Sequence, residues 1–172
     1  MGDSAMTIVA IFVAAILMFV FPLMTMADKN DDVAQLSVQT ATTEFTNTVR
    51  NTGKLTQDAY DKFVETLAAT GNSYDVEMTI QHLDENPSKK STQGKETIGE
   101  NVYYTDYTTQ ILDTLGSKGS ISLKEGDIIS VNVKNTNTTI ATQLRNFIYK
   151  VTGDSSKTIT ATESGMVTTT AN

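Results

Sequence analysis

The side chains able to do chemistry in this chain are few, and they do not form a catalytic set. His82 is the single histidine and there is no cysteine, so neither a histidine-pair nor a thiolate metal site can be built. The sequence also lacks a nucleophile elbow, a phosphate loop, a dinucleotide fingerprint and a zinc motif. His82 ends an alternating segment, where a solvent-facing or loop-edge position is expected. We therefore predict a protein that is not an enzyme, with no catalytic, cofactor or metal site and no small-molecule substrate.

Acidic residues near the N-terminus are the next candidates. Asp28, Asp31 and Asp32 lack the glycine and the distal glutamate of a calcium loop, so we expect them to form a solvated helix junction. Asp3 comes just before an apolar run, where a carboxylate is costly in lipid unless it is paired. It is expected either to lie among lipid headgroups or to pair with the N-terminal amine of an adjacent subunit in a helical bundle.

The run between these acidic groups, residues 5–27, carries no charge over 23 residues. As a helix it would be roughly 35 Å long, enough to cross a hydrocarbon core of about 30 Å. A cleaved secretory signal is the alternative, but residues 1–4 carry no Lys or Arg. A second alternative is a helix buried inside a soluble protein, but so short a chain cannot easily enclose a helix that is apolar on every side. Pro22 predicts a bend, although membrane helices also tolerate proline without any functional kink.

Composition limits what the rest of the chain can be. About 145 residues follow the span, enough for one modest domain. A net charge of −7 and no Lys/Arg cluster argue against nucleic acid as a partner. Lys29 and Arg50 near the span slightly favour a cytoplasmic domain. Because three acidic residues surround Lys29, we expect instead that the domain lies outside.

An amphipathic pattern continues directly from the span. Apolar residues recur every three or four positions with polar residues between them, at Ala34, Val38, Ala41, Phe45 and Val49. The pattern predicts a single long helix, with a transmembrane part at 1–27 and a stalk at 28–52, followed by a domain at 53–172. We expect this stalk face to pack partly on the domain. Together with Asp3 and Pro22, its five apolar residues are the candidate assembly residues.

The domain itself is predicted to be α+β, with short helices packed on an antiparallel sheet. Alternation at 74–81 and at 129–133 indicates two strands, and a last short strand is expected at 159–161. Helical spacing indicates three helices. The first begins after Thr56 as its N-cap, the second covers 104–115 and includes Tyr104, and the third covers 140–151 with Thr138 or Thr139 as its cap. The polar stretch 84–99 reads as a loop.

This architecture resembles the type IV pilin superfamily. It is most similar to pseudopilins of tight-adherence (Tad) pili of Gram-positive bacteria. The likeness covers residues 5 to about 150 and is carried by Gly53-Lys54-Leu55-Thr56-Gln57-Asp58-Ala59-Tyr60-Asp61, by 69–77, and by Gly126-Asp127 leading into 131–133. Two departures are that no basic leader precedes the span, and that alanine stands at position 5 where pilins usually carry glutamate.

The resemblance implies a membrane-anchored structural subunit that is assembled into, or primes, an extracellular filament. Its partners would be copies of itself or other pilin-like subunits, together with the membrane. Its location would be a single-pass cell membrane with the domain outside, or the filament itself. The alternative is a monomeric, membrane-anchored accessory or binding module of a conjugation or secretion machine. Filament formation separates the two hypotheses.

Overall fold

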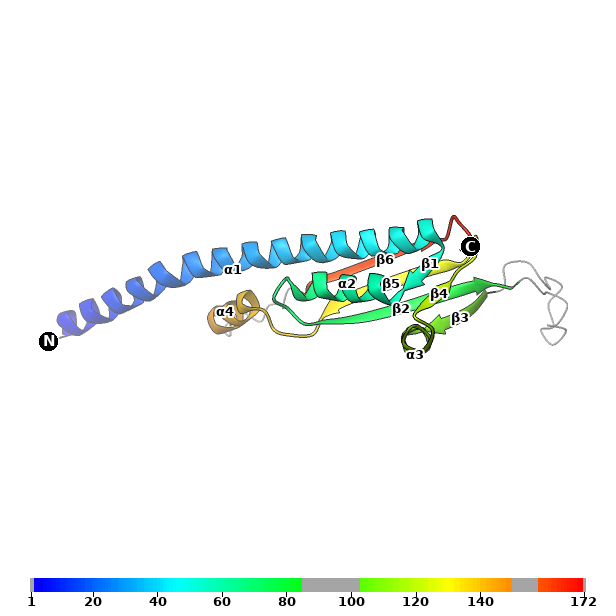
Figure 1. Ribbon diagram of the computed structural model, residues 1–172. Helices are drawn as coiled ribbons and strands as arrows, with labels where there is room; N and C mark the ends of the chain where they lie inside the picture. Colours follow the sequence, from blue (N-terminus) through cyan, green and yellow to red (C-terminus); the bar gives the residue numbers. More distant parts are fainter. Residues whose placement is uncertain (1, 85–102, 150–157, 172) are drawn as a thin grey trace, which may run out of the picture.

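The computed structural model describes residues 2–84, 103–149 and 158–171, and it has the predicted α+β fold (Figure 1). A helix of 51 residues precedes a small domain of short helices and antiparallel strands. In chain order the elements are α1 (Gly2–Thr52), β1 (Lys54–Thr56), α2 (Gln57–Ala68), β2 (Tyr74–Leu83), β3 (Tyr103–Tyr107), α3 (Thr108–Lys118), β4 (Ser120–Ser122), β5 (Ile128–Asn135), α4 (Ile140–Tyr149) and β6 (Thr160–Met166).

The larger sheet has four antiparallel strands in the order β3-β2-β5-β6, and β1 pairs with β4 in a separate two-stranded ladder. Alternation sets the register, because a shift by one residue would turn every apolar side chain to the opposite face. Met78 pairs with Val131 and Ile80 with Ile129, and all four side chains are buried. The strands predicted around 74–81 and 129–133 are confirmed, and both extend further than predicted.

The prediction was wrong at residues 103–107. This stretch was assigned in part to a helix, but it forms the edge strand β3, and α3 begins only at Thr108. The side chain of Gln110 accepts a hydrogen bond from the Tyr107 backbone N–H at 2.9 Å, which fixes this helix start. Three tyrosines in five residues favour a strand. The loop predicted over 84–99 lies, apart from Asp84, outside the described residues.

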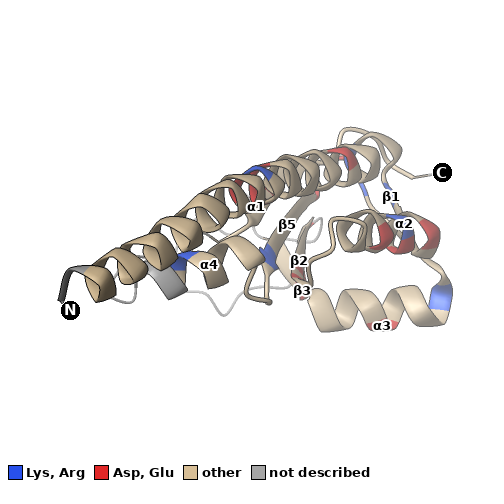
Figure 2. Cartoon of the chain, turned by 90° about the vertical axis from the view of Figure 1, so that its left-hand side faces the viewer, with Lys and Arg blue, Asp and Glu red and all other residues tan. Residues whose placement is uncertain are grey.

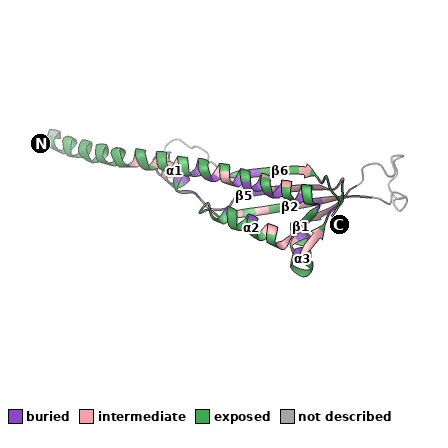
Figure 3. Cartoon of the chain, turned by 45° about the horizontal axis from the view of Figure 1, so that its top comes forward, coloured by how far each residue is buried: buried purple, intermediate pink, exposed green. Residues whose placement is uncertain are grey.

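The hydrophobic core lies between the sheet and α1, α2 and α3, which all lie on one side of β2, β3 and β5 (Figure 2). The C-terminal half of α1 contributes buried residues to this core, whereas its N-terminal half is exposed (Figure 3). Phe45 of α1 and Phe63 of α2 stack with ring centroids 4.4 Å apart and an interplanar angle of 8°. The two helices are thereby fixed against each other.

The turn after α1 depends on Gly53. Its φ of +63° belongs to the left-handed region, and its N–H caps α1 by donating to the Val49 carbonyl at 2.9 Å. A Cβ here would lie 2.1 Å from the backbone oxygen of Thr169. Both conformation and space therefore require glycine. The predicted N-cap of α2 is also confirmed, because the Thr56 hydroxyl accepts from the Ala59 N–H.

Candidate assembly surface

The apolar half of α1 projects beyond the domain. Thirteen large apolar side chains from Met6 to Met26 are 46–78% exposed, and they lie on every side of the helix. This stretch has a mean hydropathy of 2.7 over its most apolar 18-residue window, of which none is buried. Among the described residues, α1 is the one helix long and apolar enough to cross a membrane. The helix curves in this half, in agreement with a bend at Pro22 (Figure 1).

The apolar face of the stalk, predicted as an assembly surface, is covered by the domain of the same chain. Its apolar residues are between 0% and 7% exposed and belong to the core of the same chain, namely Ala34, Val38, Ala41, Phe45 and Val49. A side chain already buried in its own domain has no surface left for a neighbouring subunit. These five residues therefore hold the domain onto α1, and of the candidate residues the exposed surface of α1 retains only Pro22. Asp3 is part of α1, but its side chain lies outside the described residues.

Two polar side chains of α1 fasten it to the edge strand β6. The Gln35 side-chain amide donates to the Thr160 carbonyl at 2.7 Å and accepts from the Thr160 N–H at 3.0 Å, as a neighbouring strand would. The Arg50 Nε donates to the Met166 carbonyl at 2.9 Å. Fifteen helical residues and six strand residues span similar lengths, about 22 Å and about 20 Å. Because both ends of β6 are held, α1 cannot rotate or slide independently of the sheet.

A second polar contact fixes the point at which α1 leaves the domain. Asp31 is 3% exposed and accepts a hydrogen bond from the Thr139 hydroxyl at 2.8 Å. The same Thr139 oxygen accepts from the Thr142 N–H and so caps α4, which confirms the predicted cap. Asp28 pairs with Arg145 of α4. The prediction of a solvated junction was therefore wrong for Asp31, because α4 covers it.

The sequence carried a signal for this contact. Asp31 precedes Ala34 and Val38 by three and seven residues, so it continues the buried stripe of α1 by one more turn. A carboxylate in an apolar stripe needs a donor from another element. The partner, Thr139, lies 108 residues later. No local pattern connects the two positions.

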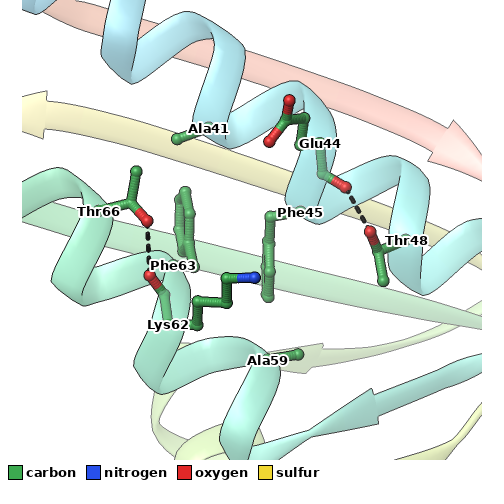
Figure 4. Close-up of a pocket in the computed structure, with 8 residues that line it drawn as sticks. All are labelled: Ala41, Glu44, Phe45, Thr48, Ala59, Lys62, Phe63 and Thr66. Atoms are coloured by element: carbon green, nitrogen blue, oxygen red, sulfur yellow. Dashed lines mark hydrogen bonds between the residues drawn. The ribbon is translucent and has the colours of Figure 1, made fainter.

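A groove of about 180 Å³ opens between α1 and α2. The stacked rings of Phe45 and Phe63 face each other within it, and Glu44 and Lys62 flank it (Figure 4). Each helix also contributes a threonine, and both hydroxyls donate to carbonyls of their own helix at 2.8 Å. These two hydroxyls at the rim of the groove therefore already have hydrogen-bond partners within the chain.

His82 was expected at a solvent-facing or loop-edge position, and the structure places it between two carboxylates. Its Nδ1 lies 2.9 Å from Asp127 and its Nε2 lies 3.5 Å from Asp106. Asp127 is buried and also accepts from the backbone N–H groups of Leu83 and Lys124. The Asp127 carboxylate therefore joins the end of β2 to the turn before β5.

Comparisons with models of protein families, with curated proteins and with solved structures give no match.

Proposed function

We propose that this chain is a structural, pilin-like subunit. The apolar half of α1 holds it in a membrane, and the same surface packs against copies of the chain in an extracytoplasmic filament. The observation that carries the proposal is that one continuous helix has two different halves. One half is apolar and has no buried residue in its most apolar window, and the other half is packed into the domain.

The uncovered half cannot remain in water. Thirteen large apolar side chains between Met6 and Met26 are exposed, and burying each contributes about 1.5–3 kcal/mol. The total is on the order of 20–40 kcal/mol, more than the whole stability of a typical domain. Lipid covers such a surface in the membrane. Outside the membrane, other subunits must cover it, and identical helices offer a matching apolar surface.

The locked half explains how the domain would follow the helix. Gln35 and Arg50 hold both ends of β6, and Asp28 and Asp31 hold α4. A subunit drawn out of the membrane by its helix would therefore carry its domain as one body. A flexible linker would instead leave domains loosely arranged around a filament. The resemblance to type IV pilins, stated from the sequence, agrees with this arrangement.

Under this proposal, the cluster of His82 and Asp127 has a structural role rather than a catalytic one. Two backbone N–H groups and His82 use the Asp127 carboxylate, which is the pattern of a carboxylate that closes a turn. Substitution of His82 by alanine should therefore leave assembly intact.

Immunoelectron microscopy of material sheared from cells tests the proposal. Antibodies against the domain should decorate filaments, and a variant with Ile11 and Ile16 changed to lysine should give none. If the wild-type chain stays entirely in the membrane fraction and crosslinks only as a monomer, the filament proposal fails. The chain would then be a membrane-anchored accessory module.

A further inference from the structure

Helix α4 lies at the end of the domain nearest the apolar half of α1 (Figures 1 and 2). It is held against α1 by polar contacts that Arg145 and the cap residue Thr139 make with two α1 residues, Asp28 and Asp31. These residues follow the last uncharged position by one and four residues, which is at most about 6 Å along the helix axis. The headgroup layer on each side of a bilayer is about 5–8 Å thick. With the apolar half in lipid, α4 would therefore stand at the level of the headgroups.

The exposed part of α4 carries one apolar residue, Ile140, together with the polar Gln143 and Asn146. Ala141 and Thr142 are buried, whereas Ile140 is 71% exposed and Leu144 is half-buried. Ile140 and Leu144 are four residues apart and so share one side of the helix. The helix contains no Asp or Glu, although the chain as a whole has a net charge of −7.

Two of the three carboxylates near this level have partners outside α1. Asp28 is paired with Arg145 and Asp31 is buried under Thr139. Asp32 and Lys29 are both exposed and of opposite charge. Docking α4 therefore removes two negative groups that would repel an anionic bilayer surface.

We propose that α4 is an interfacial helix that rests on the bilayer surface and inserts Ile140 among the lipids beside the span. The inference rests on the membrane span of the proposed function. A lipid surface is favoured over a soluble partner because the apolar surface of α1 reaches the same level. An amphipathic helix with its apolar side in the headgroup–acyl boundary is a common membrane contact. Two contacts with the bilayer would hold the domain at a fixed angle before assembly.

Spin labels on the full chain in vesicles of neutral and anionic phospholipid test this inference. Because the chain has no cysteine, Ile140→Cys gives a single labelled site. Phe12→Cys provides the lipid reference, and Ser117→Cys, exposed in the last turn of α3, provides the aqueous reference. The measured quantity is the accessibility of the label to oxygen, which concentrates in lipid, relative to a water-soluble nickel complex.

The expected ratio at position 140 is severalfold higher than at position 117 and lower than at position 12. A ratio at position 140 equal to that at position 117, with position 12 in lipid, overturns the inference and leaves the span intact. Low accessibility at position 140 to both reagents indicates a protein contact and also overturns it. If the label at position 12 is itself in water, the span fails, and this inference fails with it.

Discussion

Two phenylalanines on the same helix provide a test of its division into halves. Phe45 is 5% exposed and stacks on Phe63, whereas Phe12 is 67% exposed and has no core around it. We expect Phe45→Ala to destabilise the domain strongly and Phe12→Ala to leave the free energy of unfolding of the domain unchanged. The same chemical change is thus made in both halves of α1.

The expected size of the effect follows from the surroundings of Phe45. Replacing a buried phenylalanine by alanine costs about 3–5 kcal/mol. Phe45 borders the groove between α1 and α2, so the new cavity would open to water and the cost should lie near the lower limit. A loss of about 3 kcal/mol corresponds to a fall in the melting temperature of roughly 10 °C for a domain of this size.

Tyrosine fluorescence during thermal unfolding in detergent micelles measures this difference. All six tyrosines follow residue 52 and there is no tryptophan, so the signal reports the domain and not the apolar half of α1. Equal losses in both variants would refute the division of the helix. A loss below about 1 kcal/mol for Phe45→Ala would refute the assignment of the stalk face to the core, because core truncations cost more.

Three further predictions concern the junction, the pH dependence and the topology. Thr139→Val removes the N-cap of α4 and a hydrogen bond to the buried carboxylate of Asp31. Chemical denaturation should show that the free energy of unfolding falls by about 2–4 kcal/mol. The control Thr138→Val, at an exposed neighbouring position, should change it little. Burial, with a smaller contribution from Asp61, raises the pKa of Tyr60 above its ordinary value of 10.0. Above pH 10 the folded state therefore keeps the Tyr60 proton that the unfolded state loses. The stability that the neutral Tyr60 side chain contributes is complete below pH 10 and is lost as the pH rises through the raised pKa. Denaturation curves of Tyr60→Phe should not show this loss of stability at high pH. A membrane-impermeant thiol reagent should label Ser117→Cys in intact cells, and labelling only after lysis would place the domain inside.

The elements that the sequence predicted correctly are those with a local signal. Alternation identified β2 and β5, and Thr56 identified the start of α2, because side-chain periodicity and capping act within a few residues. The strand β3 was missed because its residues, Tyr-Tyr-Thr-Asp-Tyr, do not alternate between apolar and polar. Its place is set by pairing with β2, where Tyr107 lies opposite Thr79.

The candidate surface was predictable only in its apolar half. The absence of charge at residues 5–27 is visible in the sequence, but what the stalk face contacts is not. Gln35 and Arg50 are spaced to match β6, which lies more than a hundred residues later. Such long-range contacts depend on the whole topology. For the same reason, the periodicity of the stalk could not distinguish a core face from an assembly face.

The most direct test of the account replaces Phe12 with a photoreactive phenylalanine derivative in cells that assemble the protein. If the apolar half of α1 packs against copies of itself, irradiation should produce a ladder of adducts at multiples of the monomer mass in the sheared surface fraction. The same replacement at Phe45, which contacts its own domain, should produce no ladder. A single monomeric band for the Phe12 replacement, with crosslinks only to lipid, would contradict the account.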